Sequence, residues 1–351
     1  MSTKTLVLSE LLKTTGQTVS GESMARMFGV SRAAVWKAIA ALRREGYHII
    51  GTPNSGYAIS NDDEVMTAEL IVHHLKQRFP AYGDCFVECF KTIDSTNVHA
   101  KRILADCGSL RDPNGALTDA GRKFHCSIIT AETQTAGRGR MGRTFYSPEK
   151  TGLYMTLMYA PKGGILHPAG MTASTAVAVC RAIKKVYAVQ PAIKWVNDLF
   201  VNGKKAGGIL TEGSFNLETG HIETAIIGIG INIELQPSVL PDEVAHIAGA
   251  VLPERTQETA GRCELAAEIA GHAFDAYQEK AESILAEYKA ASIVLGKNVE
   301  VHPVIGDNTA VYTAKAVDID AEARLIVELP DGTQRKLLSG EVSLTSSAFT
   351  G

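Results

Sequence analysis

Apolar residues recur at helical spacing three times in the first part of the chain. Ser20 and Ser31 precede the second and third of these stripes, where each is able to cap a helix N-terminus. Gly29 lies between them, at a position where a tight turn needs a positive φ. A short helix, a glycine turn and a second capped helix predict a helix-turn-helix. The apolar positions are Leu6, Val7, Leu11 and Leu12, then Met24, Ala25 and Phe28, then Val35, Ile39 and Leu42.

Residues 47–60 alternate between apolar and polar positions around a turn that contains Pro53 and Gly56. This pattern predicts a hairpin, and therefore the wing of a winged helix. Such a unit places the N-terminal residues of its second helix against base edges in the major groove of DNA. A winged helix that contacts only proteins is the alternative. The expected DNA contacts are Ser31, Arg32, Ala33, Trp36 and Lys37.

The distribution of charge favours DNA as the partner of this segment. The whole chain has a net charge of -3, but its first 60 residues hold seven basic and three acidic side chains, a net charge of +4. A basic segment on an acidic body indicates that the two parts bind different partners.

The pattern changes after an acidic stretch at residues 61–67, which we interpret as a linker. A helix is expected from Thr67 to about Lys76, and strand-like runs then alternate with helices. Strands that follow one another closely favour a mixed sheet covered by helices, in the α+β class, over a doubly wound sheet. Residues 109–125 have no period and are predicted to form a surface loop. The expected strands are 86–93, 127–133, 153–160, 191–197, 206–213 and 224–233, and the longer helices are 170–188 and 262–291.

Short alternating stretches return from residue 295, with Asp331 and Gly332 at a turn. They predict a small β-barrel. The expected organisation is a winged helix at 1–63, a central domain at 64–294 and a barrel at 295–351.

Several protein classes are excluded by the sequence. Ser9, Glu10 and Lys13 interrupt the first apolar run, so no signal peptide is expected. No apolar stretch approaches the roughly 20 residues that span a bilayer. The six cysteines contain no C-x-x-C pair, which favours reduced thiols in a cytoplasmic protein over a zinc site.

One loop carries unusual chemistry. Residues 137–143 read GRGRMGR, and the first six match the G-x-G-x-x-G of dinucleotide-binding folds. That fingerprint requires a helix directly after the glycines, whereas Pro148, Gly152 and a strand-like run follow here. Arginine guanidinium groups suit carboxylates and phosphates, so we predict a mobile loop that closes over an anionic ligand. A solvated basic loop is the alternative.

Other polar residues lie near the ends of the expected strands. Lys194 and Lys205 suit phosphate, Asp198 suits Mg²⁺, and the amide of Asn232 suits the edge of a base. A structural ion pair is the alternative for Lys194 and Asp198. The DSTN run at 94–97 is able to cap a helix, which would explain it without any ligand.

Taken together, these motifs resemble the bifunctional biotin protein ligases that also repress the biotin operon. The resemblance covers nearly the whole chain. It implies a central domain like that of class II synthetases and an SH3-like barrel at the C-terminus. The motifs are DSTN at 94–97, TQTAGRGRMGR at 133–143, KWVNDLFVNGKKAGGILTE at 194–212 and GIGINI at 228–233.

The resemblance also implies roles for single residues. Met141 stands where the family often has arginine, Val196 where proline is common, and Phe145 where tryptophan stacks on adenine. Lys205, rather than Lys204, matches the ligand-binding lysine. Biotin contacts are implied for Ser95, Thr96, Asn97, Gln134, Arg138, Gly139, Arg140 and Lys205. ATP or adenylate contacts are implied for Arg140, Arg143, Phe145, Lys194, Asn197, Asp198 and Asn232. Catalytic roles are implied for Arg138, Arg140 and Lys205.

The implied reaction has two steps. The biotin carboxylate attacks the α-phosphorus of ATP, with Mg²⁺ on the phosphates, to give biotinyl-5′-AMP and pyrophosphate. A lysine of the biotin carboxyl carrier protein then takes the biotinyl group and releases AMP. Bound adenylate is expected to favour a homodimer on operator DNA, and no membrane partner is expected. Two alternatives stay open, a regulator that has lost ligation and an acyl-adenylate enzyme for another acid such as lipoate.

Overall fold

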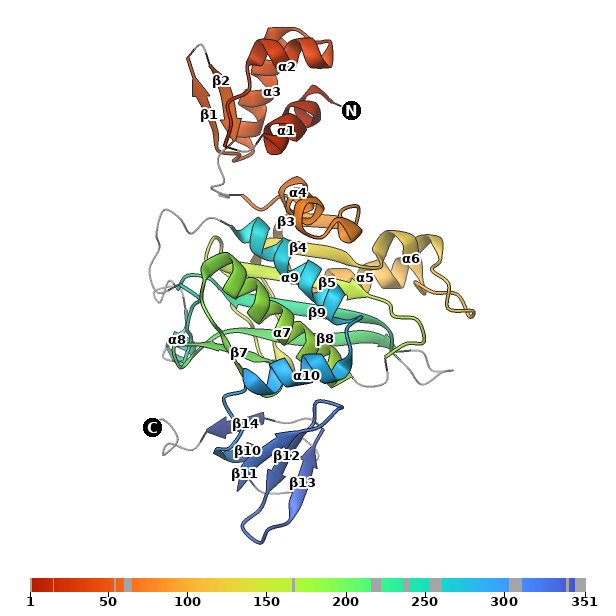
Figure 1. Ribbon diagram of the computed structural model, residues 1–351, viewed down its shortest axis with the longest axis vertical. Helices are drawn as coiled ribbons and strands as arrows, with labels where there is room; N and C mark the ends of the chain where they lie inside the picture. Colours follow the sequence, from red (N-terminus) through yellow and green to blue (C-terminus); the bar gives the residue numbers. More distant parts are fainter. Residues whose placement is uncertain are drawn as a thin grey trace.

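The computed structural model places three parts of the chain in a row along its longest axis (Figure 1). A winged helix lies at one end, a large sheet with packed helices lies in the middle, and a small antiparallel sheet lies at the other end. The structure describes residues 2–14, 16–53, 55–59, 65–165, 168–215, 222–235, 240–245, 247–252, 261–302, 311–338 and 341–344. Residues 61–64 of the predicted linker fall outside this set.

The winged helix forms as its sequence pattern predicts. Ser20 Oγ accepts a hydrogen bond from the backbone of the first turn of its helix, and Ser31 Oγ accepts one from Ala34 N. Gly29 ends the second helix with a φ of 66°, a conformation that favours glycine. The three apolar stripes meet in one core. The elements are α1 (Thr3–Lys13), α2 (Gly21–Phe28), α3 (Arg32–Arg44), β1 (Ile49–Thr52) and β2 (Gly56–Ile59).

A packed segment joins the winged helix to the middle domain. Val65 lies so close to Gly46, just after α3, that a Cβ added to Gly46 would stand 2.0 Å from the Val65 side chain. The backbone N–H of Met66 then donates to Glu132 Oε1 at 2.9 Å. Glu132 is itself ion-paired with Arg262, and both residues are buried. These contacts hold the point at which the chain enters the middle domain.

The middle domain is built on a seven-stranded mixed sheet, which confirms the predicted α+β class. The order is β3-β4-β5-β9-β8-β7-β6, with β3 and β4 parallel and the other neighbours antiparallel. The short strand β7 was not predicted, because it spans only four residues between two turns. The strands are β3 (Val87–Ile93), β4 (Ser127–Gln134), β5 (Gly152–Tyr159), β6 (Ala192–Lys194), β7 (Asp198–Val201), β8 (Lys204–Phe215) and β9 (Ile222–Asn232).

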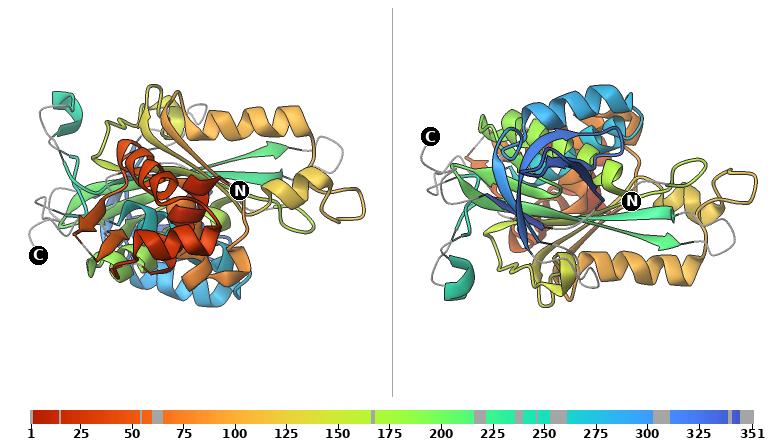
Figure 2. Two further views of the ribbon diagram at one scale, coloured as in Figure 1. Left: turned by 90° about the horizontal axis from the view of Figure 1, so that it is seen from above. Right: turned by 90° about the horizontal axis from the view of Figure 1, so that it is seen from below.

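Helices cover both faces of this sheet. Helix α5 lies on one face, and α7, α9 and α10 lie on the other (Figure 2). The helix predicted at 262–291 is two helices, because the chain turns after α9 and Lys280 is extended, with a ψ of 132°. The loop predicted at 109–125 also contains a helix, α6, which Thr118 caps through a bond from Gly121 N. The helices are α4 (Ala68–Arg78), η1 (Pro80–Tyr82), α5 (Thr96–Cys107), α6 (Asp119–Phe124), η2 (Arg140–Gly142), α7 (Pro168–Tyr187), α8 (Asp242–Ala245), α9 (Arg262–Ala276) and α10 (Ala281–Ala290).

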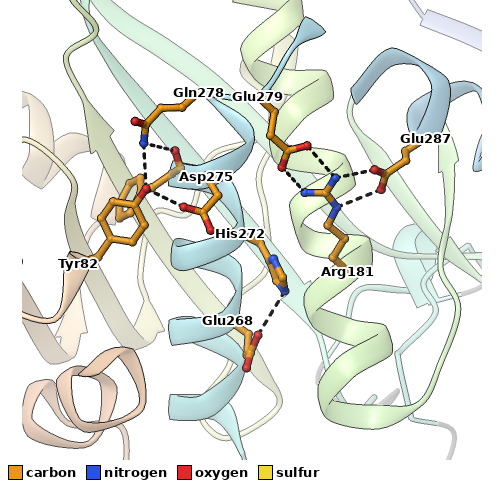
Figure 3. Close-up of polar contacts among 9 residues, drawn as sticks. Tyr82, Arg181, Glu268, His272, Asp275, Gln278, Glu279 and Glu287 are labelled. Atoms are coloured by element: carbon orange, nitrogen blue, oxygen red, sulfur yellow. Dashed lines mark hydrogen bonds and ion pairs between the residues drawn. The ribbon is translucent and has the colours of Figure 1, made fainter. Parts of the chain in front are cut away.

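Ion pairs fasten the outer helices to one another. Arg181 of α7 reaches the carboxylates of both Glu279 and Glu287, the second of which lies on α10 (Figure 3). Within α9, His272 Nε2 lies 3.3 Å from Glu268 Oε2. The helical layer is therefore tied together at its surface as well as through its apolar core.

The C-terminal part is a five-stranded antiparallel sheet in the order β13-β12-β11-β10-β14. The predicted closed barrel is not seen, because the edge strands β13 and β14 do not pair with each other among the described residues. The helices in the described ranges include none that is both long and apolar enough to cross a membrane. The strands are β10 (Asn298–His302), β11 (Tyr312–Ile319), β12 (Leu325–Glu328), β13 (Gln334–Leu337) and β14 (Glu341–Leu344).

Candidate functional site

A cavity of about 250 Å³ opens over β8, β9 and the loops beside them. Every residue that the sequence assigned to biotin, ATP or adenylate lies on the wall of this cavity. The assigned residues on this wall are Ser95, Thr96, Asn97, Gln134, Arg138, Gly139, Arg140, Arg143, Phe145, Lys194, Asn197, Asp198, Lys205 and Asn232.

The glycine–arginine loop forms a hairpin along one side of the cavity. Arg138 bridges to Thr144, and the N–H of Gly139 donates to the Arg143 carbonyl at 2.7 Å. The left-handed positions at its tip are Met141, with φ 55°, and Gly142, with φ 75°. Backbone hydrogen bonds hold the loop in this conformation, and its mobility stays a prediction.

Four side chains form a polar chain at the centre of the cavity. Arg140 Nη1 donates to Asn197 Oδ1 at 2.7 Å, and Asn197 Nδ2 donates to Asp198 Oδ1 at 3.0 Å. Lys205 Nζ lies 2.7 Å from the same Asp198 oxygen. The Lys205 side chain is 36% exposed, so its ammonium group stays accessible to an anion in the cavity.

The two neighbouring lysines differ, as the motif spacing predicts. Lys205 lines the cavity, whereas Lys204 is exposed outside it. Successive residues of a strand point to opposite faces of the sheet, so only one of the pair is able to face the cavity. This geometry supports Lys205 as the ligand-facing lysine.

The DSTN run forms the closed end of the cavity. Ser95, Thr96 and Asn97 are all nearly fully buried at the start of α5. The backbone N–H of Thr96 donates to Gln134 Oε1 at 2.9 Å. Gly228 of β9 leaves room for Asn97, because a Cβ there would stand 2.5 Å from Asn97 Oδ1. Such a small, polar and buried end suits a compact head group with hydrogen-bonding atoms.

Phe145 and Asn232 line another part of the cavity wall. The Phe145 ring lies against the backbone of Gly230, where a Cβ would stand 2.5 Å from the ring. Asn232 Nδ2 donates to the Gly249 carbonyl at 3.0 Å, so in this structure its amide holds the segment 247–252. A planar ring suits the space beside Phe145.

The sequence predicted a possible Mg²⁺ ligand in Asp198 and a phosphate ligand in Lys194. Asp198 is the one carboxylate among the described residues that line the cavity, and it is paired with Lys205. The described residues contain no group of three metal-binding side chains. Lys194 Nζ lies 5.9 Å from the centre of the Phe200 ring. One carboxylate fits a Mg²⁺ ion that arrives on phosphates better than a metal held by protein alone.

The residues predicted for DNA binding lie together on the N-terminal half of α3. Ser31, Arg32 and Ala33 are exposed at its first turn, and Trp36 and Lys37 are exposed one turn later. Trp36 is 62% exposed, so it is not part of the core.

Sequence reasoning missed several residues at this site. Trp195 lines the cavity and its indole N–H donates to the Ala323 carbonyl in the C-terminal part at 2.9 Å. Tyr288 donates to the Val196 carbonyl at 3.0 Å, and burial raises the pKa of its hydroxyl, which stays a donor. Besides Trp195, the missed lining residues include Met155, Leu240, Val244, Ile247, Ala248 and Val342. The apolar residues within 240–248 recur at helical spacing, and this pattern could have pointed to some of them.

Comparison with known proteins gives three family matches in chain order. A model described as "HTH domain" matches residues 3–58, one described as "Biotin/lipoate A/B protein ligase family" matches 124–232, and one described as "Biotin protein ligase C terminal domain" matches 294–345. Over nearly its whole length the chain is similar to bifunctional biotin ligase/repressors. It is 29% identical to the bifunctional ligase/repressor BirA of Bacillus subtilis, over 96% of this chain and 97% of that protein. It is 28% identical to BirA of Escherichia coli, over 95% and 94%.

The fold agrees with that of a solved biotin protein ligase. The structure of the Aquifex aeolicus enzyme in complex with biotin and ATP superposes with a TM-score of 0.56 and 22% identity. The match covers 74% of this chain and 98% of that one. At this identity the likeness supports the fold alone.

Proposed function

We propose that this protein is an ATP-dependent biotin protein ligase and a biotin-responsive repressor. The observation that carries the proposal is the cavity, which joins a buried polar end, a cationic middle and an apolar end beside Phe145. These three regions match the head group of biotin, the reacting carboxylate and phosphates, and the adenine ring. The bifunctional relatives are similar over nearly the whole chain.

In the first step a biotin carboxylate oxygen forms a bond to the α-phosphorus of ATP, and the bond to pyrophosphate breaks. Two anions meet in this step, so cations that face them lower the barrier. The cavity wall carries four cationic side chains that are able to face these anions, namely Arg138, Arg140, Arg143 and Lys205. Asp198 would be the carboxylate able to hold a Mg²⁺ ion bound to the phosphates of ATP, and that ion would shield their charge.

In the second step a lysine amine of the biotin carboxyl carrier protein attacks the acyl carbon of biotinyl-5′-AMP, and AMP leaves. The mixed anhydride must be kept from water until the amine arrives. The hairpin at 137–145 and the segment at 247–252 both contribute residues to the cavity wall and suit that task. Val342 lines the cavity, so the C-terminal sheet, which we propose to be the SH3-like barrel of the family, borders the place where the carrier protein docks.

The repressor function belongs to the winged helix. We propose domain boundaries at 1–63, 64–294 and 295–351, with the exposed first half of α3 on operator DNA. We further propose that bound biotinyl-5′-AMP favours a homodimer, because two winged helices related by a twofold axis match a palindromic operator.

The direct test is adenylate formation by the purified protein. With biotin and ATP labelled at the α-phosphate, we expect labelled biotinyl-5′-AMP, and with lipoate in place of biotin we expect none above background. A lipoyl adenylate made at a comparable rate would assign the enzyme to another acid. No adenylate with either acid, together with ligand-dependent DNA binding in a gel shift, would identify a regulator that has lost ligation.

A further inference from the structure

Tyr288 fixes the orientation of one peptide group in the turn between β6 and β7. It lies on α10, is fully buried and does not line the cavity. Its hydroxyl donates to the Val196 carbonyl at 3.0 Å. Burial raises the pKa of this hydroxyl, which therefore keeps its proton and stays a donor. The Val196 carbonyl is thus turned toward α10.

The same peptide group carries the backbone N–H of Asn197. The bond between Val196 and Asn197 is trans, and the C=O and N–H of a planar trans peptide point in opposite directions. The Asn197 N–H therefore points away from Tyr288. Tyr288 lies outside the cavity and Asn197 lies on its wall, so this donor is turned from the helical layer toward the cavity side of the turn.

This N–H has no acceptor in the part of the chain that the structure describes. The other polar groups of Asn197 are all used. Its carbonyl accepts from the Ile209 N–H at 2.9 Å, its Nδ2 donates to the Ile209 carbonyl at 3.1 Å, and its Oδ1 accepts from Arg140. A half-buried N–H without a protein acceptor needs an oxygen from water or from a ligand.

The bonds to Ile209 do not replace the bond from Tyr288. The Asn197 carbonyl belongs to the next peptide group along the chain, so its bond from Ile209 leaves the Val196 carbonyl unconstrained. Among the described residues, Tyr288 is the one donor to that carbonyl. The direction of the Asn197 N–H therefore depends on the Tyr288 hydroxyl.

We infer that the backbone N–H of Asn197 is a further donor to an anionic oxygen in the cavity, and that Tyr288 is the positioning residue that aims it. The inference rests on the proposed function, which supplies the anions, namely the phosphates of ATP and the carboxylate of biotin. Arg140 contacts Asn197 and draws an anion to the same place. A backbone N–H that is already aimed at growing negative charge lowers the barrier of the step.

The direct test is the amide signal of Asn197 in an NMR spectrum. Protein labelled with ¹³C at valine carbonyls and ¹⁵N at asparagine gives signals only from Val–Asn pairs, and the sequence contains two, at 196–197 and 201–202. Asn202 is exposed outside the cavity and serves as the internal reference. The variant Asn202→Gln removes one signal and so assigns both.

We expect the Asn197 amide proton to move downfield on binding and the Asn202 proton to stay in place. Movement with ATP and Mg²⁺ alone would identify a phosphate oxygen as the acceptor, and movement with biotin alone would identify the carboxylate. An Asn197 proton that stays in place with either ligand and with both, in a protein that forms the adenylate, would overturn the inference. Absence of adenylate formation by the wild-type protein would instead contradict the proposed function.

Tyr288→Phe tests the positioning role. We expect the downfield movement to shrink and the kcat of adenylate formation to fall about 10-fold, less than the roughly 100-fold that outright loss of such a donor costs. The matched control is Tyr277→Phe, whose hydroxyl lies 2.7 Å from Thr175 Oγ1 with neither residue on the cavity wall. The control should lower the melting temperature to a similar extent and keep kcat. Equal slowing in both variants would assign the effect to packing and remove Tyr288 from the mechanism.

Discussion

Two ion pairs in the middle domain have similarly short distances between their charged groups but differ in their exposure to solvent. Asp198 and Lys205 lie 2.7 Å apart on the wall of the cavity, where the lysine side chain is 36% exposed. Glu132 and Arg262 pair beneath the entry of the linker, where their side chains are 10% and 8% exposed. A pair that water reaches is able to exchange its partner for a ligand at small cost, whereas breaking a buried pair strands a charge. The first pair therefore suits ligand binding or catalysis, and the second pair suits stabilisation of the fold.

The largest expected effect is on folding. Glu132→Ala removes the partner of the buried Arg262 and the acceptor of the Met66 N–H. We expect the free energy of unfolding to fall by about 3–5 kcal/mol, as measured by denaturant titration. The matched control is Glu45→Ala, which removes a carboxylate that lies 2.7 Å from Lys4 but is 47% exposed. That change should cost less than about 1 kcal/mol, and equal losses would show that burial does not separate the two classes.

The second effect is on catalysis. Lys205→Ala removes a cation that faces the reacting anions, so we expect adenylate formation to slow about 100- to 1000-fold. The melting temperature should change little, because Asp198 keeps its bond from Asn197. Lys204→Ala is the control, since Lys204 is exposed outside the cavity. Full activity of Lys205→Ala would remove this lysine from the mechanism, and equal slowing in both variants would point to net charge and not to position.

The same contrast explains what the sequence was able to predict. The residues assigned to the cavity belong to short motifs rich in charged residues and glycines, and all of them line the cavity. The buried pair left a weak signal, because Glu132 is the one charged residue of the strand at 127–134. Its partner Arg262 is 130 positions away and opens a helix that looked ordinary. Glu212 lies inside a recognised motif, but its hydrogen bond from Asn97 joins residues 115 positions apart, and no local pattern contains such a contact.

Prediction from the sequence was also less successful for short elements and for elements that depend on pairing between distant strands. Strand β7 has four residues and α6 has six, so neither spans enough of a period to be seen. The continuous apolar pattern at 262–291 concealed a turn, because both helices that flank it bury a face against the same layer. Closure of the C-terminal barrel requires pairing between edge strands, which hydrophobic alternation does not specify.

The smallest expected effect is on how the free energy of unfolding depends on pH. It arises near the linker and not in the cavity. Burial lowers the pKa of His74, on α4 just after the linker, to about 4, with His73 lowering it further and Glu268 opposing the shift. An unfolded histidine titrates near 6.5, so between about pH 6.5 and 4 the unfolded chain binds a proton that the folded protein does not. Stability should therefore fall as the pH drops through this window and be unaffected by this group above it. His74→Gln should flatten that part of the curve of unfolding free energy against pH, measured from pH 7 to 5. An unchanged slope in His74→Gln would show that other groups carry the acid sensitivity.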